Sequence, residues 1–390
     1  MNPLSIDLIQ GFKLVLGEQG SSFALHEPEF TGREKEYINE CIDSTYVSSV
    51  GAYVDKFESM LADNTGSRYV IAVVNGTSAL QIAFHIAGIK KDQEVIIPAL
   101  SFVATANAVA LLGAVPHFVD SNEDTLGMDP SFLRDYLEDI AEITSQGARN
   151  RFTGRKIAAI TPMHTYGHPV DMYALVELAA KYRIPVIEDS AESLGSYYHG
   201  KHTGTFGELG ILSFNGNKII TTGGGGAILT ENANLAKIAR HVTTTAKIPH
   251  KWEFFHDEVA WNYRMPNLNA ALGCAQLDRL SDMVLRKRKL AEKYQKAFSA
   301  AKNIKFISEP ENCVSNYWLN TVRLMDASRS IRDEVLSAVN DNGYQCRPTW
   351  TLLNKLPMYK SCPCSSLQTS EKLESTLLNI PSSPKLADLL

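Results

Sequence analysis

Short apolar runs alternate with helix-like segments through the middle of the chain, and this alternation limits the fold more than any other feature. Helical periodicity marks residues 78–87, 105–112 and 172–182. The apolar runs, rich in β-branched residues, cover residues 69–74, 94–97, 115–119, 157–161, 186–188, 211–214 and 227–230. Such alternation is typical of a mostly parallel sheet with helices on both faces. We therefore predict an α/β fold.

The pattern changes after residue 266, and a chain of 390 residues is long enough for two domains. Residues 268–301 have the periodicity of one long helix, and residues 317–324 and 331–340 predict a strand and a helix. Residues 345–364 look irregular. We predict three parts: an N-terminal extension of a helix and a loop (1–30), a large domain (31–265) and a small C-terminal α+β domain (266–390).

Charge and composition exclude several classes of partner. The net charge is −5, so no basic excess is available to neutralise nucleic acid phosphates. The densest basic run, Arg-Lys-Arg-Lys at residues 286–289, falls in a helix-like segment and is interpreted as a solvated helix face. Residues 95–116 are mostly apolar, but Pro98 and Gly113 interrupt them, which favours a strand, a loop and a helix over a membrane span.

The six cysteines have no paired spacing of the kind that holds zinc, and a chain of this size needs no disulfides. The first eleven residues lack a basic start followed by a long apolar stretch, so no signal peptide is predicted. We therefore expect a cytoplasmic protein that does not insert into a membrane.

Residues 75–80, Asn-Gly-Thr-Ser-Ala-Leu, lie where a predicted strand ends and a predicted helix begins. The glycine permits a tight turn, and the hydroxyls of Thr77 and Ser78 lie beside the free N–H groups of the helix. This arrangement can bind an anion. A helix cap without a ligand explains the same residues.

Two acidic residues, Asp189 and Glu192, follow the predicted strand at 186–188. Ligands of open α/β sheets bind at this end of the strands. A carboxylate buried there stays ionised only when a positive group pairs with it. The alternative is that Asp189 caps the next turn.

Lys218 follows the apolar pair at residues 211–212 and precedes Ile219 and Ile220. A lone lysine near a strand end is usually solvated, but a desolvated lysine has a lowered pKa and can act as an amine nucleophile in Schiff-base chemistry.

The glycines at 223–226 are followed by a strand-like run, where a nucleotide-binding loop would open a helix. A tight loop therefore explains them better than a nucleotide cradle.

The order and spacing of these motifs resemble the DegT/DnrJ-type sugar aminotransferases over residues 30–384. The shared motifs are Gly-Thr-Ser-Ala-Leu at 76–80, Asp-Ser-Ala-Glu at 189–192, Ser-Phe-x-x-x-Lys at 213–218, Thr-Thr-Gly-Gly-Gly-Gly at 221–226, Pro-Ala-Leu-Ser-Phe-Val-Ala-Thr-Ala-Asn at 98–107, His-Thr-Tyr-Gly at 164–167, Gly-Thr-Phe-Gly at 204–207 and Asn-Tyr-Arg-Met at 262–265. The resemblance implies the type I aminotransferase fold, with a mostly parallel seven-stranded sheet, and pyridoxal 5′-phosphate (PLP) as cofactor.

The resemblance also implies roles for single residues. Lys218 would anchor PLP covalently and move protons during catalysis, and Asp189 would keep the pyridine nitrogen of PLP protonated. Phe102 would stack on the ring, and Glu192 would lie near the ring hydroxyl.

The phosphate of PLP would lie against Gly76, Thr77, Ser78 and Ser213. Asn262 would reach across a dimer interface to the phosphate of the other subunit, which implies a homodimer with shared active sites.

Two departures suggest a branch of the family. Many relatives carry Gln in place of Glu192 and His in place of Asn215. Together with the N-terminal extension, these differences resemble enzymes that use L-glutamate to aminate C4 of UDP-2-acetamido-2,6-dideoxy-hexos-4-ulose, as in legionaminic acid and bacillosamine pathways. A GDP-4-keto-6-deoxymannose aminotransferase of the perosamine synthase type is the alternative. Family dehydratases replace the anchoring lysine by histidine, so Lys218 favours transamination.

Candidate substrate contacts are His164, Asn215, Lys247 and Arg347. Lys247 and Arg347 lie in loop-like segments, and surface exposure explains them equally well. No metal site is expected, because the spaced histidine pairs fall in loops without a zinc-protease pattern. A regulatory protein that kept the fold and lost catalysis is the alternative from another class, although Lys218 and Asp189 argue against it.

Overall fold

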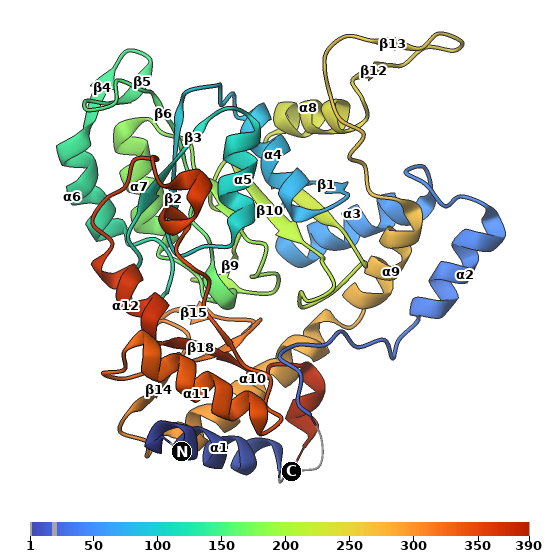
Figure 1. Cartoon of the computed structure of the whole chain (residues 1–390). Helices are drawn as coiled ribbons and strands as arrows, with labels where there is room; N and C mark the ends of the chain where they lie inside the picture. The colour runs from blue at the N-terminus through green and yellow to red at the C-terminus, as the bar shows by residue number, and fades with distance from the viewer. Residues whose placement is uncertain (1, 18–21, 390) are drawn as a thin grey trace.

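A twisted central sheet forms the middle of the molecule in the computed structural model, which describes residues 2–17 and 22–389 (Figure 1). Its strands in the described chain are β1 (Tyr69–Val73), β2 (Glu94–Pro98), β3 (Val115–Val119), β6 (Ile157–Ile160), β7 (Ile187–Asp189), β10 (Leu209–Ser213) and β11 (Gly226–Thr230). Hydrogen bonds give the orders β1-β11-β10-β7 and β3-β2-β6, and a parallel bridge between Ile160 and Val186 joins the two groups. β11 is antiparallel to both neighbours, and the other pairs are parallel. The predicted seven-stranded, mostly parallel sheet is confirmed.

Helices cover both faces of this sheet because successive strand residues point in opposite directions. Ile71 and Val73 of β1 pack in a cluster with one set of helices, whereas Val70 and Ala72 pack in a cluster on the other face. The first set is α4 (Gly76–Ile86), α5 (Val103–Leu111) and α8 (Ala233–Thr243); the second is α2 (Glu34–Ser44), α3 (Ala52–Thr65) and α9 (Asn267–Leu277). Towards the β3 side, α6 (Pro130–Ile140) and α7 (Met172–Tyr182) complete the core.

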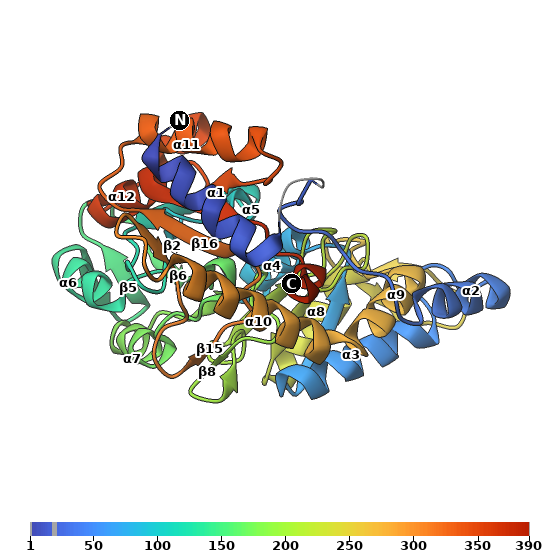
Figure 2. The ribbon, with the colours of Figure 1, turned by 90° about the horizontal axis from the view of Figure 1, so that it is seen from below.

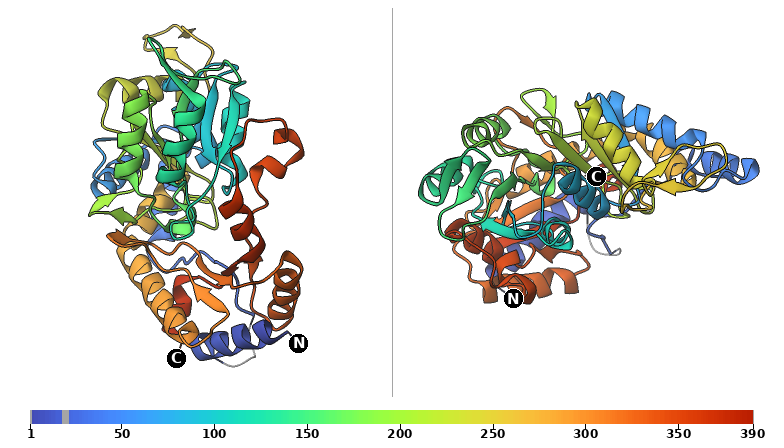
Figure 3. Two further views of the ribbon diagram at one scale, coloured as in Figure 1. Left: turned by 90° about the vertical axis from the view of Figure 1, so that its left-hand side faces the viewer. Right: turned by 90° about the horizontal axis from the view of Figure 1, so that it is seen from above.

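A second, antiparallel sheet lies below the first in the left-hand view of Figure 3. Its strand order is β14-β16-β18-β17, and α10, α11 and α12 accompany it. The bounds of these elements are α10 (Leu280–Phe298), β14 (Ile304–Phe306), β16 (Asn320–Leu324), α11 (Arg329–Asp341), β17 (Arg347–Pro348), α12 (Gln368–Thr376) and β18 (Leu377–Ile380). The division of the chain at residues 265 and 266 stays a prediction, since α9 packs with the face of the large sheet.

The N-terminal helix α1 (Pro3–Leu16) packs on α10 and α11, as Figure 2 shows. It starts at a proline, and the side chain of Asn2 accepts a hydrogen bond from the Leu4 N–H. Phe12 is fully buried against the rings of Tyr294 and Phe298. The helix of the predicted N-terminal extension is therefore an integral part of the core around the second sheet.

Two predictions for residues 266–301 are wrong. The single long helix is two helices, α9 and α10, because Arg279 leaves the helical conformation (φ −112°, ψ 0°). Its guanidinium lies 2.6 Å from a Glu29 carboxylate oxygen. The basic run is not a purely solvated face either: Lys287 is fully buried and donates to the carbonyls of Trp318 and Ser382.

Three small antiparallel sheets lie outside the two main sheets in the described chain. Two are hairpins, β4 (Ala141–Thr144) with β5 (Gly147–Asn150) and β12 (Lys247–Ile248) with β13 (Phe255–His256). In the third, β15 (Cys313–Val314) pairs with the hairpin of β8 (Tyr197–Tyr198) and β9 (Lys201–His202). Residues 247–256, here called the projecting hairpin, extend away from the body at the top of Figure 1. Within the described residues, no helix has both the length and the apolar character needed to cross a bilayer.

Candidate active site

A cavity of about 300 Å³ lies at the carboxyl ends of the central strands. Many of the residues predicted for the site meet in it, although they come from separate segments of the chain. The cavity is lined by Asn75, Gly76, Thr77, Leu80, Phe102, Ala104, Met163, Asp189, Ala191, Glu192, Ser213, Asn215, Asn217, Lys218, Trp318 and Trp350.

Lys218 reaches into this cavity from the loop after β10, and its side chain is 11% exposed. Its Nζ lies 3.2 Å from Glu192 Oε1 and 3.9 Å from the centre of the Trp318 ring. The Trp318 indole is itself held, because its Nε1 donates to the Asn217 carbonyl at 2.6 Å. The amine of Lys218 is thus held between a carboxylate and an aromatic face.

Asp189 is the last residue of β7, and its carboxylate is buried. One oxygen accepts a 2.6 Å hydrogen bond from the Thr105 hydroxyl, and the other accepts from the Ala191 N–H at 3.2 Å. Burial raises the pKa of Asp189, and the Thr105 hydrogen bond opposes that rise. A cationic group bound in the cavity would stabilise the ionised form, and a protonated pyridine nitrogen meets this need.

Glu192 is buried next to Lys218. Its Oε2 accepts a 2.9 Å hydrogen bond from the backbone N–H of Tyr166, a residue held at φ 56° in a tight turn. Burial raises the pKa of Glu192 to about 7, and the charge of Lys218 opposes the rise. The cavity therefore holds one carboxyl group that titrates near neutral pH.

The start of α4 forms one wall of the cavity. Asn75 caps this helix by accepting a 2.7 Å hydrogen bond from the Ser78 N–H. A Cβ at Gly76 would lie 2.8 Å from the Cβ of Ser213, so only glycine allows this approach. The hydroxyl of Thr77 and the N-terminus of the helix offer donors to an anion such as the phosphate of PLP.

These residues fit PLP. Lys218 suits the carbon of PLP that reacts with amines, Asp189 suits the ring nitrogen, and the start of α4 suits the phosphate. Phe102 also lies in the cavity, with its ring 6.2 Å from that of Trp350. Ser78 is buried behind the wall and does not line the cavity. The glycine-rich segment forms a tight loop that leads directly into β11 at Gly226, as predicted.

His164 does not line the cavity, contrary to the prediction that it contacts substrate. Its ring is fully buried, with Nε2 lying 3.1 Å from a Glu188 oxygen and Nδ1 accepting from the Val170 N–H. Glu188 also accepts three backbone N–H groups from residues 204–207. The motifs at 164–167 and 204–207 therefore share a supporting network behind the site.

Lys247, Arg347 and Asn262 also lie outside the cavity of this chain. Lys247 begins the projecting hairpin. Arg347 is exposed on β17, where its Nη1 donates to the Cys346 carbonyl. Asn262 is exposed after the hairpin, so a contact with PLP phosphate would need another copy of the chain.

Several side chains that shape the site were missed by sequence reasoning. Thr105 bonds to Asp189, and Met163 and Trp318 line the cavity, but each comes from a different segment. Trp350, which also lines the cavity, lies in the irregular segment at 345–364 where substrate contacts were expected. Thr105 falls inside the shared motif at 98–107, which was a usable signal. Trp318 comes from beyond α10, and nothing local distinguishes its sequence from a buried strand.

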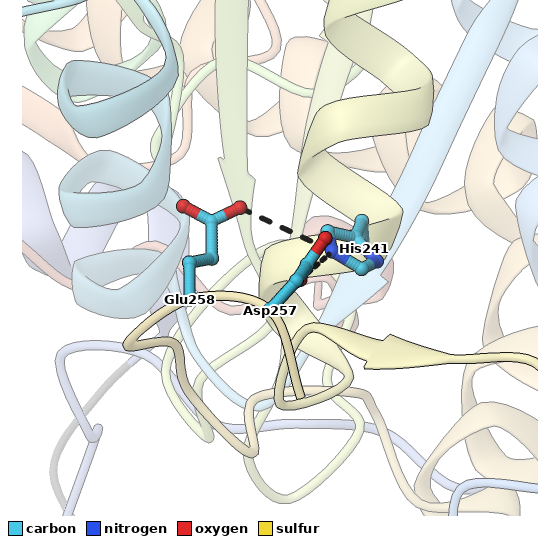
Figure 4. Close-up of side chains that lie close together, drawn as sticks. All are labelled: His241, Asp257 and Glu258. Atoms are coloured by element: carbon cyan, nitrogen blue, oxygen red, sulfur yellow. Dashed lines mark hydrogen bonds and ion pairs between the residues drawn. The ribbon is translucent and has the colours of Figure 1, made fainter. Parts of the chain in front are cut away.

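At the base of the projecting hairpin, His241 of α8 faces Asp257 and Glu258 (Figure 4). The Nε2 of His241 lies 2.7 Å from Asp257 Oδ1 and 4.0 Å from Glu258 Oε1. Since the shorter contact is already a hydrogen bond, this pair ties the hairpin to α8 without needing an ion.

Comparisons with known proteins agree with this arrangement. The model of the DegT/DnrJ/EryC1/StrS aminotransferase family matches residues 28–389. The chain is 37% identical to GDP-perosamine synthase of Escherichia coli O157:H7, over 93% of this chain and 94% of that protein. It is 34% identical to GDP-perosamine synthase of Caulobacter vibrioides, over 93% of each. The solved structure of the aminotransferase TlmJ from Streptoalloteichus hindustanus is similar, with a TM-score of 0.83, 26% identity, and 93% and 94% of the two chains covered.

Proposed function

Because the chain belongs to the DegT/DnrJ/EryC1/StrS aminotransferase family and is therefore a PLP-dependent sugar aminotransferase, we propose that it aminates C4 of a nucleotide-linked 4-keto-6-deoxy sugar. L-Glutamate is the proposed amino donor. The presence of Lys218 and Asp189 in one cavity argues against the alternative of a non-catalytic regulatory protein. The observation that carries the proposal is the meeting of Lys218, Asp189 and Glu192 in one buried cavity.

When bound, PLP joins an amine through its aldehyde carbon with loss of water and stabilises negative charge on the carbon attached to that nitrogen. Asp189 supports this by holding a proton on the pyridine nitrogen. The Nζ of Lys218 would hold the cofactor between turnovers. When free, the same amine would act as the base that removes the proton from the donor's Cα and as the acid that returns a proton during amination of the sugar.

The walls of the cavity suit a sugar substrate. Phe102, Met163, Trp318 and Trp350 contribute apolar surface to the lining, and the exposed Asn215 and Asn217 contribute amide groups. An aromatic surface packs well against the C–H face and methyl group of a 6-deoxy sugar, and it excludes water from the proton transfers.

Two nucleotide sugars are candidates, each with its own support. Glu192, Asn215 and the N-terminal segment favour UDP-2-acetamido-2,6-dideoxy-hexos-4-ulose, which would serve nonulosonic acid or surface polysaccharide synthesis. The relatives named GDP-perosamine synthase favour GDP-4-keto-6-deoxymannose. A direct assay decides between them: each keto sugar is incubated with glutamate, and 2-oxoglutarate and the amino sugar are measured. Amination of neither would contradict the proposal.

The anchoring role of Lys218 has a separate test. After borohydride reduction and digestion, mass spectrometry is expected to find the cofactor mass on the peptide that contains Lys218. The Lys218→Ala variant should lose that adduct. An adduct on another lysine would contradict the assignment.

We also propose a homodimer with shared active sites. Apart from Lys218, no basic residue lines the cavity among the described residues, so a phosphate bound there calls for further donors. An exposed Asn262 could supply one to a neighbouring copy. The six cysteines are free thiols, which is consistent with the proposed cytosolic location.

Subunit mixing tests this sharing. Lys218→Ala and Asn262→Ala homodimers are each expected to be inactive. Random mixing of the two should restore about one quarter of wild-type activity, because half of the dimers are mixed and each mixed dimer has one intact site. No restoration would show that each site is built from one chain.

A further inference from the structure

The charges in the active-site cavity do not balance. Among the described residues that line it, the ionisable side chains are Asp189, Glu192 and Lys218. Both acids are buried, so neither is well solvated by water. Two carboxylates next to one ammonium leave one negative charge without a partner, which is costly in a buried site.

The two acids differ in what surrounds them. Asp189 accepts hydrogen bonds from Thr105 and from the Ala191 N–H, and its predicted partner is the ring nitrogen of PLP. Glu192 has the Tyr166 N–H on Oε2 and Lys218 on Oε1. The other titratable groups near Glu192 are Asp189, whose charge disfavours a second carboxylate, and the phenol of Tyr166, which is neutral at ordinary pH.

Loading of the cofactor removes the donor on which Glu192 depends. A free Lys218 ammonium carries three hydrogens, but a nitrogen doubly bonded to carbon keeps at most one. Oε1 of Glu192 then faces a nitrogen with at most one hydrogen to donate, while Glu192 itself is only 3% exposed to solvent. A buried carboxylate in that position responds by binding a proton.

We propose that Glu192 is the proton-carrying partner of Lys218: its carboxyl group is protonated while Lys218 is joined to PLP, and it accepts a hydrogen bond as a carboxylate when the amine is free. This inference rests on the proposed anchoring role of Lys218. In this proposal Glu192 gains a proton when Lys218 joins PLP and loses that proton when the amine is free.

Three features support this role. Oε2 is already occupied by the Tyr166 N–H, so the added proton belongs on Oε1, the oxygen that faces Lys218. Tyr166 is held in a left-handed conformation (φ 56°), with its hydroxyl 2.6 Å from that of Thr349, so its N–H cannot easily turn away. Burial also raises the pKa of Glu192 to about 7, where both protonation states are accessible.

The test compares wild type with Glu192→Gln, which keeps the shape of the side chain and an acceptor for the Tyr166 N–H but cannot ionise. Glu138→Gln is the matched control, because Glu138 forms an exposed ion pair with Lys181 far from the cavity. Two quantities are measured: proton uptake when PLP binds to the cofactor-free protein, by calorimetry in buffers of different ionisation enthalpy, and the absorption of bound PLP as a function of pH.

At pH 8, Glu192→Gln should take up fewer protons per bound PLP than wild type, by up to about one proton. The pH-dependent change in the absorption of bound PLP should disappear or move by about one pH unit or more. Glu138→Gln should match wild type in both measurements. Equal proton uptake and equal titration in wild type and Glu192→Gln would overturn the proposal.

Two further results keep the test decisive. If Glu192→Gln does not bind PLP, Glu192→Asp replaces it: an ionisable acid should preserve the proton uptake, and its loss in that variant would contradict the inference. If borohydride reduction of wild type leaves no cofactor on Lys218, the proposed function fails instead. That outcome is distinct, because it does not depend on the residue at position 192.

Discussion

The part of the cavity formed by Asp189, Glu192 and Lys218, here called the floor, differs from the projecting hairpin in which side chains are buried. On the floor, Asp189 and Glu192 are buried, and each has hydrogen-bond donors within reach. On the hairpin, Trp252 and Phe254 are 73% and 80% exposed. Polar groups are therefore enclosed in one region, while large apolar groups face solvent in the other.

This difference indicates which parts of the site one chain can complete. The floor is formed by β7, α5 and the loop after β10. β7 and α5 pack in the core cluster on one face of the sheet and the loop packs in the cluster on the other, so the geometry of the floor is set within the chain. The hairpin has strands of two residues each, too short to be stable by themselves. Its exposed aromatic side chains are typical of a surface that packs against another molecule, which agrees with the proposed dimer.

The largest effect is expected on the floor. Lys218→Ala should reduce transamination by about 10⁴-fold or more, because one amine both anchors the cofactor and moves the proton. Lys289→Ala, an exposed lysine on α10, serves as control and should leave turnover unchanged. Steady-state kinetics measure both. If the Lys218→Ala variant kept activity within tenfold of wild type, Lys218 would not be the catalytic amine and the floor would not be the catalytic region.

A smaller loss should follow from weakening the support of Asp189. Asp189→Asn should lower turnover by about 10²–10³-fold, since a neutral amide does not hold a proton on the ring nitrogen. Thr105→Val removes one hydrogen bond to the carboxylate and should cost about tenfold. Both variants should keep the PLP adduct on Lys218. A Thr105→Val enzyme less active than Asp189→Asn would mean that Thr105 acts by another route.

The buried acids should also make the stability of the cofactor-free protein depend on pH. The folded pKa of Glu192 lies above its ordinary value of 4.5, so its favourable contribution is complete below pH 4.5 and is lost as the pH rises towards about 7. Glu192→Gln should therefore flatten this part of the stability curve. Urea unfolding between pH 5 and 8 measures the slope, and parallel curves for the two proteins would contradict the burial argument.

The smallest effect on folding should come from the hairpin. Trp252→Ser should change the free energy of unfolding of the monomer by no more than about 0.5 kcal/mol, because the side chain is exposed. The same change should weaken self-association if the hairpin packs on a second copy. Sedimentation at several concentrations measures the dissociation constant. An unchanged constant would indicate that the hairpin is not part of an interface.

Sequence reasoning worked best where the signal was local. Alternating apolar runs located the central strands, and the strand ends placed Asp189 and Lys218 at one edge of the sheet. It failed where a side chain's role depends on distant neighbours. His164 lies in a shared motif, yet both of its ring nitrogens bond inside the protein.

The amino-acid sequence alone predicted the α/β class and the turn that opens α4 at Gly76, because periodicity and turn chemistry act over a few residues. The role proposed for Lys218 came instead from the resemblance of its motif to the aminotransferase family. Only the tertiary structure decided that Trp318 lies against Lys218, that Lys287 is buried and that Glu192 shares its oxygens between Tyr166 and Lys218. These facts depend on burial and on contacts between segments far apart in the chain, where the balance of desolvation and pairing is set by packing.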